Sequence, residues 1–342
     1  MNVRRLIPTA ALTGSVTLGL VALSACSPSD AADGAGGDRT SGDRLAVVTS
    51  FYPMQYLAEE IGGTHVDVST LTKPGVEPHD LELSTRQAAR LGEADYILYL
   101  KGIQPAVDEA VAAAGVPDTV DAATLTTLEK HGSEVGHAHE GEEHAGEDGA
   151  HGEDAGHGDE HGHEGEGEAG TDPHIWLDPV KYAEVARGVG ASLEKADPDN
   201  AAAYRKNTTA LVERLDGLDS AFKDGLADTA TKTFITTHSA FGYLAERYGL
   251  TQESLAGLSP ESEPSPARIK ELRAIAARDK VGTVFFETLV SDRTAKTVAA
   301  DGGLRTDVLD PVEGITDRSK GADYVEVMES NLAALEKALG AK

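Results

Sequence analysis

Histidine is the residue of this chain with the most evident capacity for chemistry, because imidazole binds borderline metals and exchanges protons near neutral pH. The chain holds twelve histidines, and eight of them lie in one acidic segment: His131, His137, His139, His144, His151, His157, His161 and His163. Ordering a flexible chain costs about 1–2 kcal/mol per residue, so histidines in such a segment are expected to bind a metal only weakly. Tight binding must come from the other four.

Three of those four histidines, His79, His174 and His238, occupy similar places in the sequence pattern. His79 follows a predicted strand and a Pro-Gly turn in KPGVEPHD, and His174 lies between two Asp-Pro pairs in DPHIWLDP, just before a helix. In FITTHSAFGYL, His238 lies where a strand gives way to a helix, whereas His65 precedes a strand and is interpreted as a surface residue. Ligands of parallel α/β sheets bind in loops beyond the carboxyl ends of the strands. Three imidazoles in such loops predict a site for a borderline metal, above all zinc.

Carboxylates near the C-terminus are the candidates for the fourth ligand that zinc needs. In VLDPVEGITD, Glu313 is the preferred residue and Asp310 is its rival. Glu287, in VFFETLV, is a third carboxylate at a predicted strand end. Its setting predicts a supporting role, either orienting a ligand imidazole or acting at a hinge.

Alternating strands and helices are predicted to position these residues. In the first half, strands are expected at 45–53, 65–75 and 95–102, and helices at 54–63, 84–94 and 105–115. In the second half, strands are expected within 231–241, 281–290 and 304–314, and helices at 264–280, 292–303 and from residue 323 onward. This alternation predicts an α/β protein with two similar lobes, each a parallel sheet flanked by helices.

One long helix is expected to join the two lobes. Its apolar residues are spaced 7, 4, 3 and 4 positions apart, which places them on one face: Tyr204, Leu211, Leu215, Leu218 and Phe222. The expected organisation is an N-terminal lobe over residues 45–197, the linking helix over 198–224 and a C-terminal lobe over 225–342. An acidic, His-rich insertion at 131–172 interrupts the first lobe, and its composition cannot form a core.

The N-terminus has the features of a secretory signal. Arg4 and Arg5 precede an apolar run that ends at Leu23-Ser24-Ala25-Cys26, which resembles a bacterial lipobox. We therefore expect residues 1–26 to be a lipoprotein signal peptide and Cys26 to carry the lipid that anchors the protein outside the cytoplasm. A plain signal peptide with an incidental cysteine is the alternative. Residues 27–44 are small and polar and predict a flexible tether, and a single cysteine precludes an internal disulfide.

The formal net charge of −28 argues against a nucleic-acid partner, because an acidic surface repels phosphate. The charge is unevenly distributed. Between His131 and Asp172 there are fourteen Asp and Glu residues and no Lys or Arg, so this segment accounts for half of the excess.

Taken together, the lipobox and the segments PGVEPHD, DPHIWLDP, THSAFGYLAERYGL and FFETLVS…VLDPVEGIT resemble the metal-specific solute-binding lipoproteins of bacterial ABC importers, most closely the zinc-binding branch. The resemblance runs from around residue 45 to the C-terminus. It implies two lobes bridged by a rigid helix, with His79, His174 and His238 binding the metal between them. The manganese branch has a carboxylate at the third position, so His238 favours zinc.

The fourth ligand of that family varies. The resemblance matches it to Glu313, but some members use the Asp of LDP, which is Asp310 here, or a water molecule. The acidic, His-rich insertion is also typical of the zinc branch. It predicts either a low-affinity zinc-collecting loop or a solvated insertion without a role in uptake; the residues of such a loop would be His137, His139, His144, His151, His157, His161 and His163.

The sequence thus predicts a monomeric extracytoplasmic receptor, not an enzyme, that captures one zinc ion between its lobes and delivers it to an ABC permease. The alternatives are a surface-anchored zinc-dependent hydrolase and a metal-stabilised adhesin. A hydrolase needs an open zinc position, which Glu313 would occupy, and no HExxH motif occurs. Because imidazole must be neutral to bind, affinity is expected to fall as the pH drops through about 6.5.

Overall fold

The computed structural model describes residues 44–131 and 171–342. The expectations for the signal peptide, Cys26, residues 27–43 of the tether and the histidines from His137 to His163 lie outside the described residues.

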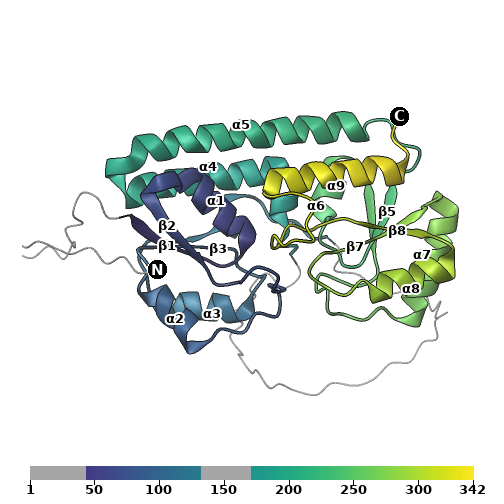
Figure 1. Ribbon diagram of the computed structural model, residues 1–342, viewed down its shortest axis with the longest axis horizontal. Coiled ribbons are helices and arrows are strands. Elements are labelled where there is room, and N and C mark those ends of the chain that lie inside the picture. The colour runs from purple at the N-terminus through teal and green to yellow at the C-terminus, as the bar shows by residue number, and fades with distance from the viewer. Residues whose placement is uncertain (1–43, 132–170) are drawn as a thin grey trace, which may run out of the picture. The chain divides into compact units, whose positions relative to one another are not determined.

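The N-terminal lobe is a four-stranded parallel sheet in the order β2-β1-β3-β4 (Figure 1). Its strands are β1 (Leu45–Thr49), β2 (Val66–Thr70), β3 (Tyr96–Tyr99) and β4 (Thr119–Asp121), and its helices are α1 (Tyr52–Gly62), α2 (Thr85–Gly92) and α3 (Pro105–Ala114). Successive residues of a strand point to opposite faces. Val47 and Leu98 therefore pack with α1 on one face, while Val48 and Ile97 pack with α2 and α3 on the other.

The C-terminal lobe repeats this topology, with a parallel sheet in the order β6-β5-β7-β8. Its strands are β5 (Thr233–Thr236), β6 (Thr251–Ser254), β7 (Thr283–Phe286) and β8 (Arg305–Val308), and its helices are α6 (Gly242–Arg247), α7 (Pro266–Asp279), α8 (Arg293–Gly302) and α9 (Tyr324–Leu339). Phe234 and Phe285 face one side, whereas Ile235 and Val284 face the side of α7 and α8. The prediction of two similar parallel α/β lobes is confirmed.

The long helix is α5 (Ala201–Leu226), whose 26 residues span about 39 Å. A short 3₁₀ turn (Pro198–Asn200) precedes it, so the regular helix begins slightly later than predicted. All five residues of the predicted apolar stripe are buried. Helix α5 packs against α4 (Pro179–Ala196), against α1 of the first lobe and against α9 of the second. Among the described residues, no helix combines the length and apolarity needed to cross a membrane.

The two lobes also share a hydrophobic core. One continuous cluster of buried side chains includes residues of α1, α4, α5, α9 and both sheets. Trp176 lies within it, fully buried, in the short 3₁₀ helix Ile175–Leu177. Its indole N–H donates a hydrogen bond to the Pro311 carbonyl oxygen at 2.7 Å, and Tyr324 donates its hydroxyl proton to the Trp176 carbonyl oxygen at 2.5 Å. The two lobes are therefore joined by this shared hydrophobic core as well as by helix α5.

Candidate metal centre

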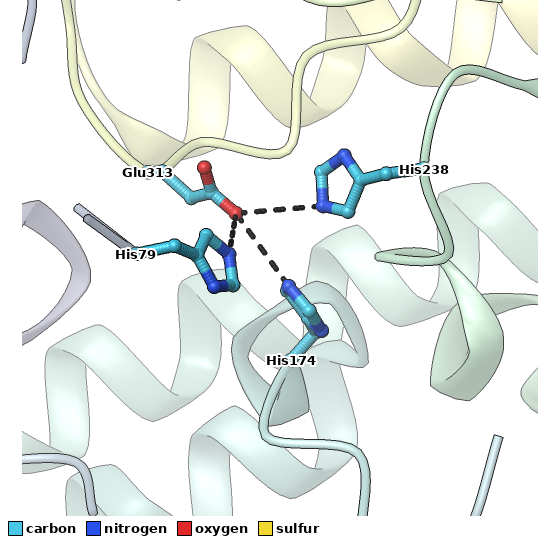
Figure 2. A group of neighbouring side chains, drawn as sticks. All are labelled: His79, His174, His238 and Glu313. Atoms are coloured by element: carbon cyan, nitrogen blue, oxygen red, sulfur yellow. Dashed lines mark hydrogen bonds and ion pairs between the residues drawn. The ribbon is translucent and has the colours of Figure 1, made fainter. Parts of the chain in front are cut away.

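Four side chains from distant parts of the chain meet between the two sheets: His79, His174, His238 and Glu313. Each offers one nitrogen or oxygen atom, and these atoms all lie within 4.8 Å of one another. Figure 2 shows one carboxylate oxygen of Glu313 facing all three imidazoles. Its Oε1 atom lies 3.4 Å from Nε2 of His79, 3.5 Å from Nε2 of His174 and 3.8 Å from Nε2 of His238. We call these four residues the main centre.

His79 lies in the loop between β2 and α2, beyond the carboxyl end of its strand as predicted. Its backbone N–H donates a hydrogen bond of 3.0 Å to Oε1 of Glu77, which fixes the loop locally. The His79 side chain remains 11% exposed, whereas the other three members of the main centre are fully buried. His79 is therefore the member of the main centre that contacts solvent.

His174 lies at the N-cap position of the 3₁₀ helix that contains Trp176. Its Nδ1 atom donates to Oδ1 of Asp172 at 2.7 Å, and its backbone N–H donates to the same oxygen at 2.9 Å. Because the carboxylate can only accept, Nε2 is the nitrogen without a proton in the neutral ring and points to the centre. This role of Asp172 was not predicted from the sequence, although the pattern Asp-Pro-His places a carboxylate two residues before a ligand candidate and was a usable signal.

His238 directly follows Thr236 and Thr237 at the carboxyl end of β5, next to Glu287 at the end of the neighbouring strand β7. Its Nδ1 atom donates to Oε1 of Glu287 at 2.6 Å, and the Thr237 hydroxyl donates to the same oxygen. The adjacency of parallel strands brings the two side chains together. Glu287 thus holds the His238 ring with Nε2 toward the centre, which is the orienting arrangement expected from the sequence.

Glu313 and its rival Asp310 lie in one loop after β8, but only Glu313 belongs to the main centre. Asp310 accepts hydrogen bonds from the Val312 backbone N–H and the Thr288 hydroxyl, both at 2.9 Å. Val312 has φ 58°, a left-handed conformation that a β-branched residue rarely adopts and that costs about 1–3 kcal/mol. Asp310 therefore stabilises the strained turn that directs Glu313 inward.

The charges of the main centre are strongly coupled. Burial disfavours the imidazolium form of His174, but the Asp172 and Glu313 carboxylates together outweigh it and raise the pKa of His174 to about 9. Burial also favours the neutral acid of Glu313, yet the imidazoles of His174 and His79 hold the pKa of Glu313 below its usual value. Burial and the nearby Glu313 carboxylate raise the pKa of Glu77 to about 9. In the metal-free protein, a proton on His174 therefore balances part of the negative charge of the Asp172 and Glu313 carboxylates.

The donor atoms of the main centre suit zinc. Nε2 of His174, Nε2 of His238 and Oε2 of Glu313 are buried and have no hydrogen-bond partner among the described residues. A buried polar atom without a partner is costly, and a bound cation removes that cost. Three imidazole nitrogens and one carboxylate oxygen are ligands that Zn²⁺ prefers in four-coordinate sites. His65 is not part of the centre; its ring lies edge-on to Tyr204.

A second group of potential metal ligands consists of Glu129, His131 and Glu246, with candidate atoms again within 4.8 Å. We call these three residues the outer group. This group was not predicted from the sequence, because His131 is one of the eight histidines of the acidic segment. The signal that could have separated His131 is its position at the very start of that segment, two residues after Glu129.

Comparison with known proteins places this arrangement in context. The chain matches the family model described as "Zinc-uptake complex component A periplasmic" over residues 47–338. It is 34% identical over 322 residues to the zinc-binding lipoprotein AdcA of Streptococcus pneumoniae, which covers 92% of this chain but only 58% of the relative. It therefore spans little more than half the length of that relative. It is also 35% identical over 306 residues to the high-affinity zinc uptake system protein ZnuA of Bacillus subtilis, covering 88% of this chain and 89% of the relative.

Among solved structures, the chain is similar to the Zn(II)-bound ZnuA-like domain of Streptococcus pneumoniae AdcA. The TM-score is 0.68 and the sequence identity is 30%, with 87% of this chain and 99% of that domain covered. The similarity thus includes both lobes and the linking helix.

Proposed function

Because the chain belongs to the family of periplasmic zinc-uptake component A proteins, we propose that it is an extracytoplasmic receptor that binds one Zn²⁺ ion with high affinity and delivers it to an ABC permease. The ligands in this proposal are the three histidines and Glu313 of the main centre. The observation that carries it is the convergence of four donor atoms from both lobes within 4.8 Å.

The architecture supports capture rather than catalysis. His79 and His174 come from the first lobe, and His238 and Glu313 come from the second, so a bound ion joins the lobes. Release needs only a small displacement of one lobe, because tetrahedral zinc tolerates little lengthening of its bonds of about 2.0–2.2 Å. The route to solvent lies at His79, whose side chain is the exposed member of the centre.

A hydrolase or an adhesin is not favoured. Catalytic zinc keeps one coordination position open for water, whereas in our proposal Glu313 supplies the fourth ligand of a buried centre. The family is one of transport receptors and not of enzymes. In our proposal, Cys26 carries a lipid that anchors a monomeric receptor at the membrane, and Glu287 supports His238.

Two roles for the segment from His137 to His163 remain as proposals: a weak zinc-collecting loop and an insertion without a part in uptake. Deleting residues 132–170 separates them. A collecting loop requires that the deletion slow zinc uptake at low external zinc without changing the affinity of the main centre.

The test of the function is titration of the metal-free full chain with Zn²⁺ and Mn²⁺ in competition with a chelator. One tight zinc phase is expected, and His238→Ala should remove it because a buried ligand is lost. Manganese binding as tight as zinc binding, or a tight phase that survives His238→Ala, would contradict the proposal. A strain without the protein should grow poorly on low zinc and recover when zinc is added.

A further inference from the structure

The outer group lies at the ends of the segment 132–170. Glu129 and His131 directly precede this segment, and Asp172 follows it. Asp172 N–H donates a hydrogen bond of 2.8 Å to the Glu129 carbonyl oxygen, which holds the two ends of that segment together. Glu246 belongs to α6 of the C-terminal lobe, so the group, like the main centre, draws its residues from both lobes.

Two residues of α6, Gly242 and Tyr243, pack against the His131 side chain. The Tyr243 hydroxyl accepts a hydrogen bond from the Glu129 N–H and donates one to the Asp172 carbonyl oxygen, both at 2.8 Å. The His131 ring lies edge-on to the Tyr243 ring, with 4.4 Å between centroids. A Cβ atom on Gly242 would lie 2.3 Å from Cβ of His131, so only glycine leaves room for the imidazole.

One carboxylate orients an imidazole of each metal-ligand group. Oδ1 of Asp172 accepts from Nδ1 of His174, and Oδ2 of Asp172 lies 3.1 Å from Nδ1 of His131. The Nε2 atom of His131 therefore points away from Asp172 and lies 2.8 Å from Oε2 of Glu246. A carboxylate that holds one ring nitrogen and directs the other outward is the arrangement that supports metal-binding histidines.

We propose that Glu129, His131 and Glu246 form a second divalent-cation site, weaker than the main centre, that binds zinc at the seam between the lobes. Nε2 of His131 and one oxygen from each glutamate supply three ligands, and water completes the coordination. An imidazole with two carboxylates suits Zn²⁺.

Two features make this site weak. The Glu246 side chain is 59% exposed, so water competes for its carboxylate. Lys181 lies 2.7 Å from Oε1 of Glu129 and already neutralises part of the negative charge. An incoming cation must displace this ammonium group or share the carboxylate with it. Both effects favour fast exchange, in contrast to the buried main centre.

The test uses the full chain in which the seven histidines from His137 to His163 are replaced by glutamine, so that they do not contribute. Zinc is titrated by calorimetry in competition with a weak chelator, after the main centre has been filled with one equivalent. One further zinc ion is expected. Glu246→Gln and His131→Gln should each weaken that second phase by about tenfold or more, which corresponds to at least about 1.4 kcal/mol.

The matched control is Glu329→Gln, which removes one exposed carboxylate of α9 and should leave both phases unchanged. Because Glu246 is largely exposed, Glu246→Gln should keep the fold and the tight phase even if His131→Gln does not. The site is refuted if the parent chain binds no second ion, which would leave the three residues as an ion-pair network. It is equally refuted if the second phase survives both substitutions. The tight phase is measured separately, so failure of the main centre would be recognised as such.

Discussion

In the main centre, His174, His238 and Glu313 are fully buried, whereas in the outer group His131 is partly exposed and Glu246 is more than half exposed. Both groups contain an imidazole held by Asp172. Within residues 44–131 and 171–342, no lysine or arginine forms an ion pair with the main centre, whereas Lys181 pairs with Glu129 of the outer group. The same orienting carboxylate thus serves two environments. From the difference we expect burial and the absence of a competing cation, rather than ligand type alone, to make the main centre the tighter of the two sites.

The largest expected effect is loss of a buried ligand. His174→Gln should lower zinc affinity by about a thousandfold, or about 4 kcal/mol, because it removes one donor and leaves Asp172 without its imidazole partner. Chelator competition measures the change. His65→Gln, the same substitution at a histidine outside both groups, should bind zinc like the parent. Equal losses in the two variants would mean that the main centre is not the tight site.

The next largest effect is the pH dependence of zinc affinity, because protons compete with zinc for His174. His174 has a pKa of about 9 in the metal-free protein and must be neutral to bind, so zinc binding releases this proton below that pH. Zinc affinity should therefore rise about tenfold per unit between about pH 6 and pH 8 for each proton released. Calorimetry in buffers of different ionisation enthalpy counts those protons. An affinity that is constant over this range would exclude His174 as a ligand.

The protonation of His174 also affects the stability of the metal-free protein. The folded pKa of His174 is raised above its unfolded value, so its contribution is complete below about pH 6.5 and is lost as the pH rises through about 9. The loss should be about 3 kcal/mol, because each pKa unit corresponds to about 1.4 kcal/mol, and denaturant unfolding measures it. Saturating zinc should greatly reduce this dependence because the bound imidazole is neutral throughout.

Substitution of the carboxylates that orient the histidines separates the main centre from the outer group, because Asp172 contacts a histidine of each and Glu287 contacts only His238 of the main centre. Asp172→Asn should weaken zinc binding at the main centre by about tenfold to a hundredfold, because an amide no longer stabilises the same ring tautomer. It should also weaken the second zinc phase, whereas Glu287→Gln should affect the main centre alone. If both variants change both phases equally, Asp172 has no specific connection to the outer group.

The smallest effect concerns packing beneath His131. Gly242→Ala places a Cβ 2.3 Å from Cβ of His131 and 2.9 Å from Oδ2 of Asp172, so it should lower stability by about 1–3 kcal/mol. Thermal unfolding measures the change. Gly217→Ala, in α5 with no atom within 4 Å of the added Cβ, should instead stabilise the protein by about 0.5–1 kcal/mol. Stabilisation by Gly242→Ala would mean that His131 is not held against α6.

Much of the fold could be predicted because the pattern of strands and helices is strong in the buried elements. The apolar stripe of α5 and the runs that became β1, β3, β5 and β7 are examples. Strands β4 and β6 were not predicted, because they are edge strands of three and four residues that carry mostly polar side chains. Their structure depends on pairing with β3 and β5, which no local pattern reveals.

The candidate ligands were found from their loop positions, since the carboxyl ends of parallel strands converge whatever the sequence between them. The choice between Asp310 and Glu313 was open, because both lie in one loop. The hydrogen bonds of Asp310 to Thr288 and Val312 separate them. The bond to Thr288 joins the ends of β7 and β8, so it depends on the pairing of these two strands. The ligand role of the four residues stays a prediction for the titrations above.

The sequence by itself determined the alternation of elements, and with it two parallel sheets and the three histidines at their loops, because periodicity and loop position are local properties. Only the tertiary structure decided which atoms face one another. The sharing of Asp172 by His131 and His174, and the approach of Glu246 to His131, join residues far apart in the chain. Those contacts depend on how α6 of one lobe packs against the loop ends of the other, and side-chain direction is fixed only by that packing.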